Sequence, residues 1–174
     1  QPGINRLDPN FQTAQVMNFI LGSSGFGSRL MVEIREKRGL TYGIYTSLSN
    51  MDHFDSLSVS TSTENKNAGE MLSLIRAEWE KMKTEPVSDK ELLDAKNYLI
   101  GSLPLSLTST NQIAGLLLSI QMDGLPIDYL QQRERAIQNS SKQDVQNLAQ
   151  KMLDTSKMVS VLTGQPEGLE NFET

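Results

Sequence analysis

One stretch, from Gly22 to Tyr42, constrains the fold of this chain more than any other: GSSGFGSRLMVEIREKRGLTY. It opens with glycines that permit backbone angles and close approaches that a side chain would block, at Gly22, Gly25 and Gly27. Ser28 is a candidate N-cap for a short helix, and Gly39 suits its C-terminal end. Between them lies an apolar stripe at helical spacing, formed by Leu30, Met31 and Ile34. The stretch therefore predicts a glycine-rich turn followed by a short helix.

A strand is predicted after this helix, from Leu40 to Leu48. Arg35 then lies in the last helical turn, and Tyr42 lies at the start of the strand. A long cation and a phenol could reach one place from these two positions. From the spacing alone an ordinary interpretation is favoured, in which the arginine interacts with the negative end of the helix dipole and the tyrosine packs at a strand edge.

The motifs of this stretch resemble those of a known family. The run Leu-Gly-x-x-Gly-Phe-x-Ser-Arg-Leu starts at Leu21, and Arg-Glu-Lys-Arg-Gly-Leu-x-Tyr extends from Arg35 to Tyr42. Both are similar to the non-zinc half of the pitrilysin/insulinase-type metallopeptidases, the mitochondrial processing peptidase superfamily. Further similar stretches follow in order, Ile100-Gly-Ser-Leu-Pro-Leu, Gly124-Leu-Pro-Ile-Asp-Tyr-Leu and Asp144-Val-Gln.

The resemblance implies an α+β fold, with helices packed on one face of a mostly antiparallel sheet (the LuxS/MPP-like metallohydrolase fold). It also implies a clamshell of two homologous halves around an extended peptide substrate. One half would carry zinc on an H-x-x-E-H motif, and the other would supply an arginine and a tyrosine, matched here by Arg35 and Tyr42. Tyr42 would then donate to the oxyanion of the attacked carbonyl, and Arg35 would hold a nearby substrate carbonyl. Zinc, water and general base would come from the partner half.

Zinc chemistry within this chain is not expected. The chain has a single histidine, His53, and no H-x-x-E-H, whereas a catalytic zinc site takes about three protein ligands. His53 lies in a polar turn, where a solvated side chain is predicted. The glycine-rich turn also lacks the lysine and the spacing of a phosphate-binding loop. We therefore expect no metal or other cofactor in this chain and no activity from the chain alone.

Length and composition predict one globular domain over residues 1–174, with 37% apolar and 21% charged residues. The net charge of −5 argues against general binding of nucleic acid. No apolar run reaches the length of a membrane span, and no cysteine is present. Because the sequence starts at Gln1 without a signal-like segment, we expect a fragment that lacks its first strand. The compartment stays open between bacterial cytoplasm, periplasm and mitochondrial matrix.

The rest of the chain predicts a hairpin, a series of helices and a final strand. A second strand over 57–61 is expected to pair with the first, and a last strand is expected over 157–163. Helices are predicted over 8–21, 66–83, 109–124 and 126–137, and from caps at Ser88 and Ser141. Gly101 and Pro104 are expected to interrupt the helix that Ser88 caps.

Two functions from different classes remain. The first is the catalysis-assisting half of a zinc peptidase, and the second is a non-catalytic scaffold or assembly subunit of the same superfamily. The presence of both Arg35 and Tyr42 favours the first, because a scaffold has no chemical need for the pair.

Overall fold

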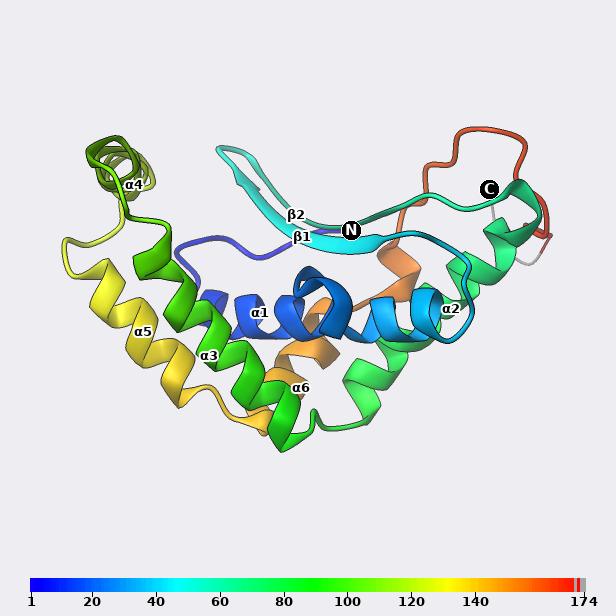
Figure 1. The fold of residues 1–174 in the computed structure, drawn as a ribbon, viewed down its shortest axis with the longest axis horizontal. Helices are drawn as coiled ribbons and strands as arrows, with labels where there is room; N and C mark the ends of the chain where they lie inside the picture. Colours follow the sequence, from blue (N-terminus) through cyan, green and yellow to red (C-terminus); the bar gives the residue numbers. More distant parts are fainter. Residues whose placement is uncertain (171, 173–174) are drawn as a thin grey trace.

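The computed structural model describes residues 1–170 and 172, and these form an α+β fold. A two-stranded antiparallel sheet lies above a group of helices, with α1 (Phe11–Asn18) directly beneath it (Figure 1). The predicted class, helices on one face of an antiparallel sheet, is confirmed.

The sheet has one buried and one outward face. β1 (Ile44–Met51) and β2 (Phe54–Thr61) pair from Ile44 with Thr61 to Met51 with Phe54. The helix-facing side chains include three buried ones, Ile44, Thr46 and Leu57. The alternate positions carry mainly serines, at 47, 49, 56, 58 and 60. This alternation of apolar and polar residues is what an antiparallel sheet with one solvated face requires.

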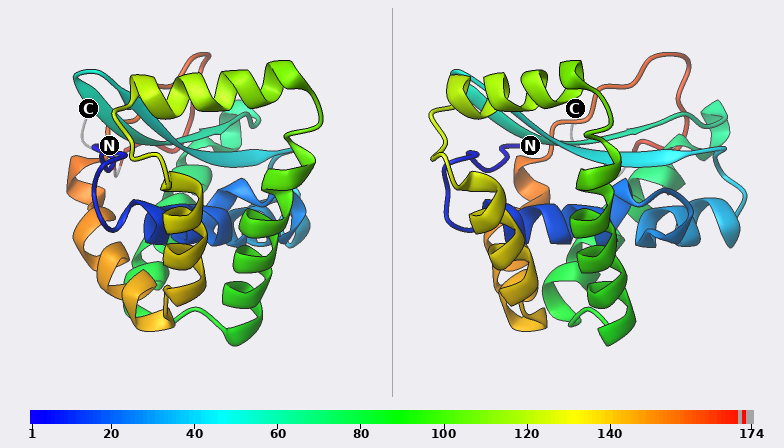
Figure 2. Two further views of the ribbon diagram at one scale, coloured as in Figure 1. Left: turned by 90° about the vertical axis from the view of Figure 1, so that its left-hand side faces the viewer. Right: turned by 60° about the vertical axis from the view of Figure 1, so that its left-hand side comes forward.

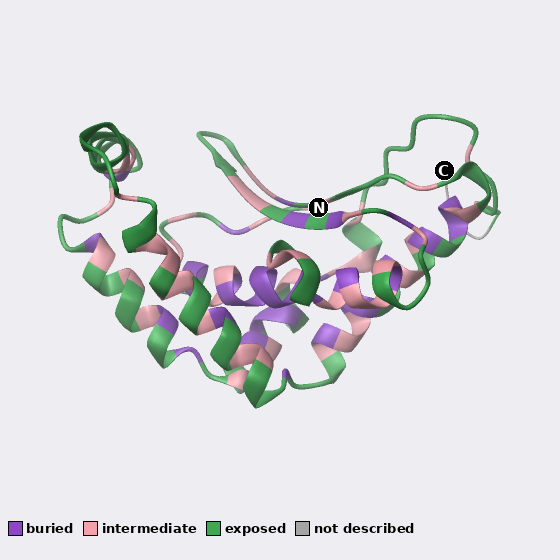
Figure 3. Cartoon of the chain, viewed as in Figure 1, coloured by how far each residue is buried: buried purple, intermediate pink, exposed green. Residues whose placement is uncertain are grey.

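Five longer helices follow the hairpin: α2 (Ala68–Thr84), α3 (Asp89–Leu105), α4 (Thr110–Met122), α5 (Tyr129–Asn139) and α6 (Lys142–Met152). The core lies between the sheet, α1 and α2, where the buried residues concentrate (Figure 3). The predicted stripe of α2 is confirmed, since most of it is buried: Ala68, Met71, Ile75, Trp79 and Met82. By contrast, α4 lies at the level of the sheet, apart from the other helices (Figure 2).

The structure bears out two predicted helix starts. Ser88 and Glu91 form a reciprocal capping box at the start of α3, and Ser141 forms one with Asp144 at the start of α6. α3 continues through Gly101 and Pro104 to Leu105, so the expected interruption is wrong.

Two predicted boundaries also differ, and one predicted strand does not form in the described part of the chain. α1 starts at Phe11 rather than at residue 8, because the Asp8 carboxylate accepts the Asn10 N–H and forms a local turn. β1 starts at Ile44 rather than at Leu40, because hydrogen bonds between the Thr41 side chain and the Gly43 backbone form a turn there. The predicted strand over 157–163 is wrong within the described part of the chain. A short 3₁₀ turn (Thr155–Lys157) is followed there by irregular, exposed backbone.

Candidate functional site

The glycine-rich turn joins two short π-helical segments, η1 (Phe19–Ser23) and η3 (Met31–Glu36). π-Helical turns are rare in proteins, and those that do occur often lie at functional sites. A Cβ on Gly22 would lie 2.5 Å from the Thr46 side chain, so only glycine lets η1 pack this closely on β1. Gly25 adopts a φ of 69°, a conformation that side chains disfavour. The glycines thus permit the predicted close approach and the turn.

The end of η3 fixes the backbone of Arg35. Gly39 has a φ of 66°, its N–H donates to the Arg35 carbonyl at 2.9 Å, and the Leu40 N–H donates to the Ile34 carbonyl at 3.1 Å. These bonds satisfy carbonyls that a helix end would otherwise leave unpaired. The predicted role of Gly39 as the residue that ends the helix is therefore confirmed. The Ser28 hydroxyl, in contrast, donates to the Gly25 carbonyl at 2.9 Å, and no N–H of the following helix bonds to this side chain in the described part of the chain.

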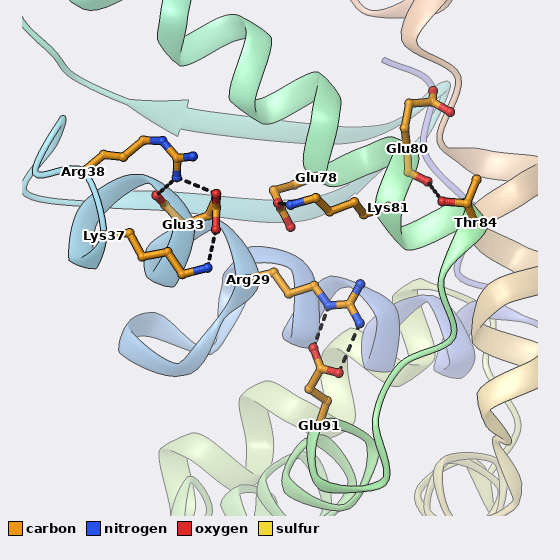
Figure 4. Close-up of polar contacts among 9 residues, drawn as sticks. All are labelled: Arg29, Glu33, Lys37, Arg38, Glu78, Glu80, Lys81, Thr84 and Glu91. Carbon is orange, nitrogen blue, oxygen red and sulfur yellow. Dashed lines mark hydrogen bonds and ion pairs between the residues drawn. The ribbon is translucent and has the colours of Figure 1, made fainter.

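Arg35 differs from the two cations that follow it. Lys37 and Arg38 both bond to the Glu33 carboxylate, and their hydrogen bonds hold the pKa of Glu33 at about 2 (Figure 4). The Arg35 guanidinium instead lies over the Phe26 ring, with 4.6 Å between its central carbon and the ring centroid. Among the described residues, no carboxylate pairs with Arg35. A cation held only by an aromatic face keeps its N–H donors available.

Tyr42 lies in a short turn that several hydrogen bonds hold in place. The Thr41 hydroxyl accepts the Gly43 N–H at 3.1 Å and donates to the Gly43 carbonyl at 2.9 Å, and the Thr61 hydroxyl donates to the same carbonyl at 3.0 Å. These bonds make a turn at residues 41–43, which is why β1 starts only at Ile44. The Tyr42 side chain is 97% exposed. The ordinary interpretation, a tyrosine packed at a strand edge, is therefore wrong for Tyr42.

The two candidate residues thus project from neighbouring fixed backbones, one at a helix end and one in a turn. No hydrogen bond or ring contact joins Arg35 to Tyr42 within the described residues. Chemically they offer a guanidinium and a phenolic hydroxyl, two donors suited to carbonyl or anionic oxygen.

An ion pair ties the glycine-rich turn to α3. Arg29 donates to both carboxylate oxygens of Glu91, at 2.6 and 3.1 Å (Figure 4). Burial alone would raise the pKa of Glu91, but the bonds from Arg29 and Ser88 hold it at about 2. A hollow of about 570 Å³ lies beside this link, lined by residues that include Phe19, Ser24 and Tyr98. Neither Arg35 nor Tyr42 lines it.

The described residues contain no group of three or more histidine, cysteine or carboxylate side chains that could hold a metal ion. His53 is exposed in the turn between β1 and β2, as predicted. None of the helices in this part of the chain is long and apolar enough to cross a membrane.

Sequence reasoning missed the residues that support the pair. Phe26, Thr41 and Thr61 each contact one of the candidate segments. Phe26 has a local signal, an aromatic residue between two glycines. The pairing of Thr61 with residues 41–43 depends on the hairpin register and has no signal in the sequence.

Comparison with known proteins places the chain in a family. Residues 1–99 match a family profile described as "Peptidase M16 inactive domain". A Helicobacter pylori protein described as "Non-peptidase homolog YmxG" is 33% identical over 146 residues, which cover 82% of this chain and 33% of that protein. A Bacillus subtilis protein described as "Uncharacterized zinc protease YmxG" is 33% identical over 96 residues, 55% of this chain and 23% of that protein.

Solved structures of peptidase M16 inactive domains share the fold of this chain. A peptidase M16 inactive domain from Pseudomonas fluorescens superposes with a TM-score of 0.81 at 35% identity, covering 88% of this chain and 37% of that one. The inactive peptidase domain of a putative zinc protease from Bordetella parapertussis shares the fold, with a TM-score of 0.76 at 16% identity, over 88% and 82% of the two chains. This chain spans about a third or less of the length of the curated relatives it matches.

Proposed function

Because this chain belongs to the peptidase M16 inactive domain family, we propose that it is the non-zinc half of a two-half zinc metallopeptidase, in which Arg35 and Tyr42 act on a peptide carbonyl. The zinc-bearing half, fused or separate, would be its partner. An extended peptide enclosed between the halves would be its substrate.

The exposure of Tyr42 is the observation that carries this proposal. A tyrosine that is 97% exposed contributes almost no packing, yet Thr41 and Thr61 fasten the turn that presents it. Because hydrogen bonds already hold the turn in place, the backbone needs little reorganisation to bring the phenol to a carbonyl oxygen on which charge develops. A fixed turn under a solvent-exposed phenol therefore supports a role toward something outside this chain.

Arg35 supports the same assignment through its charge. The neighbouring cations are neutralised by Glu33, while Arg35 rests on Phe26 with its N–H groups unused by any described carboxylate. A substrate carbonyl could therefore accept from Arg35 without first breaking an ion pair.

In this proposal the partner half would hold the zinc, which would supply the activated water. Tyr42 donates its hydroxyl proton in a hydrogen bond to the carbonyl oxygen as negative charge develops there. Arg35 binds a second carbonyl of the same peptide and fixes its position. Only interactions that strengthen in the transition state raise kcat, so Tyr42 should affect kcat, whereas Arg35 should affect KM as well.

A second candidate function is a non-catalytic scaffold of the same family. One specific observation favours it: the Helicobacter pylori relative, 33% identical over most of this chain, is described as a non-peptidase homolog. On this alternative, loss of the Tyr42 hydroxyl would have no consequence for peptide cleavage.

Hydrolysis of a quenched fluorescent peptide, with and without the zinc-bearing half, separates the two candidates. The chain alone should be inactive. With the zinc half, Tyr42→Phe should lower kcat by about 10²-fold or more, since it removes one oxyanion donor. Arg35→Ala should raise KM and lower kcat/KM.

Tyr45→Phe and Arg135→Ala are matched controls, because Tyr45 is also an exposed tyrosine and Arg135 an exposed arginine on α5. Both controls should leave the rates unchanged. If Tyr42→Phe and Arg35→Ala matched the unmutated complex, the catalytic pair would be refuted and the scaffold favoured.

A further inference from the structure

An apolar surface without charge extends over α4 and the end of the hairpin. From Asn97 to Met122 the chain carries no charged residue, although 21% of all its residues are charged. α4 makes up the second half of this run, and its exposed side carries Leu117, Leu118 and Met122. Monomeric proteins rarely expose a large continuous apolar surface, and those that do often use it for binding. The exposed side of α4 therefore has the composition of a binding surface.

The end of the hairpin continues this surface. Met51 of β1 and Phe54 of β2 are paired, and both occupy outward positions of the sheet. This end of the hairpin lies near α4, and both lie on the same side of the helical layer (Figures 1 and 2). We call these side chains, which are each between 56% and 77% exposed, the end patch: Met51, Phe54, Leu117, Leu118 and Met122.

Two consecutive residues hold the two parts of the end patch near each other. The Asn5 side chain donates to the Asp55 carboxylate of the hairpin at 3.1 Å. Arg6 forms an ion pair with the Asp123 carboxylate at the C-terminal end of α4. Because the Cα atoms of adjacent residues are only about 3.8 Å apart, these bonds bring the hairpin and α4 close together. The end patch is therefore one surface and not two separate ones.

The outward face of the sheet connects the end patch with Tyr42. β1 begins two residues after Tyr42 and has 8 residues, which span about 27 Å at about 3.4 Å per residue. An extended peptide of about eight to ten residues has the same length, so one peptide can reach from Tyr42 to the end patch. The outward positions along this path are uncharged: Tyr45 with Ser60, Ser47 with Ser58, and Ser49 with Ser56.

This continuity indicates which occupant fits the end patch. Helices that bind membrane surfaces carry lysine and arginine beside their apolar side, and α4 has neither. A charged side chain that entered the end patch would lose water without gaining a partner, whereas an aliphatic side chain would gain by leaving water. An uncharged path that runs from Tyr42 to an apolar end suits an extended polypeptide with apolar side chains at its far end.

We propose that the end patch binds an apolar segment of the peptide substrate, about eight to twelve residues from the bond that is cleaved near Tyr42. This inference rests on the proposed function and adds a substrate class, extended polypeptides with aliphatic residues at that distance. The small serine side chains between the two sites place little demand on the residues that cross them. Substrates that lack the apolar segment bind only through the groups near Arg35 and Tyr42.

Quenched fluorescent peptides that share one cleavage sequence test this proposal on the complex of the chain with its zinc-bearing half. Each peptide continues in a glycine-serine spacer that ends, about ten residues from the cleaved bond, in Leu-Ile-Leu or in Asn-Thr-Asn. Because the end patch does not fix the chain direction of the peptide, the spacer is placed before the cleaved bond in one pair of peptides and after it in another.

In one of the two pairs, kcat/KM for the Leu-Ile-Leu peptide should exceed that for the Asn-Thr-Asn peptide by about ten-fold or more, through a lower KM. In the double variant Leu117→Ser/Leu118→Ser this ratio should fall to about one, because the apolar contact is removed. Leu93→Ser is the matched control and should keep the ratio, since Leu93 is 57% exposed, like Leu117, but lies on α3 outside the end patch. A ratio near one in both pairs for the unmutated complex, or an unchanged ratio in the double variant, would overturn the proposal.

Failure of the proposed function gives a different result. If the complex cleaved none of the peptides, the catalytic role would fail, and binding to the 174-residue chain alone would decide the end patch. Fluorescence anisotropy of the labelled Leu-Ile-Leu peptides measures this binding. Saturable binding that the double variant weakens by about ten-fold would keep the end patch as a peptide site. Absent binding, or binding that the double variant leaves unchanged, would overturn it.

Two further results would also overturn the proposal by naming another occupant. Sedimentation of the chain with phosphatidylcholine vesicles, lost in the double variant, would make the occupant a lipid surface. Dimers of the chain in analytical ultracentrifugation that the double variant dissociates would make it a second copy.

Discussion

At the scale of single residues, Phe26 determines how Arg35 is presented. The Phe26 ring is 65% exposed and supports the guanidinium at 4.6 Å, a contact worth about 0.5–1 kcal/mol at an exposed site. We predict that Phe26→Leu, which keeps an apolar side chain but removes the aromatic face, raises KM in the complex with the zinc half. Phe26→Tyr, which keeps the face, should not.

Urea denaturation of both Phe26 variants provides the control. Because the side chain is mostly exposed, the free energy of unfolding should change by less than about 1 kcal/mol in either variant. An equal KM for Phe26→Leu and the unmutated chain would show that the ring does not position Arg35.

At the scale of elements, the Arg29–Glu91 ion pair joins the glycine-rich turn to α3. The folded pKa of Glu91 is about 2, below its ordinary value of 4.5, so its contribution to stability is complete above about pH 5 and is lost as the pH falls toward 2. We predict that Glu91→Gln lowers the free energy of unfolding by about 1–3 kcal/mol at pH 7, and that the difference disappears near pH 2.

Glutamine is the sharpest substitution here because it still serves as the third residue of a capping box, so the charge is removed with the cap largely kept. Glu85→Gln is the control, since Glu85 is exposed and no bond to its side chain is present among the described residues. Urea unfolding between pH 2 and 7 measures both. A pH-independent difference for Glu91→Gln would mean that packing, and not charge, supplies the stabilisation.

At the scale of the whole molecule, the packing of elements decides which apolar stripes form the core. Leu117 of α4 and Ile137 of α5 both lie on predicted helices, but Leu117 is 57% exposed and Ile137 is fully buried. We predict that Ile137→Ala lowers the free energy of unfolding by about 2–5 kcal/mol, and Leu117→Ala by less than about 0.5 kcal/mol. Thermal or urea unfolding of the two variants checks this, and equal losses would show that α4 is packed in solution.

The sequence by itself determined most of the helices through local signals, whereas the class of fold and the candidate pair were implied by the resemblance of its motifs to a known family. The helices follow from local physics: the α2 stripe, the serine caps of α3 and α6, and the glycine that ends η3 all act within a few residues of one another. The same local logic predicted Tyr42 in a strand, and that was wrong, because the Thr41 hydroxyl competes for the backbone at residues 41–43.

Only the tertiary structure decided what depends on distant partners. The bond from Thr61 to the Tyr42 turn and the exposure of α4 join or separate residues far apart in the chain. The segment 158–163 shows the reason most clearly. Its residues favour a strand, but backbone hydrogen bonds in a sheet come from a neighbouring strand, and no propensity can supply that neighbour.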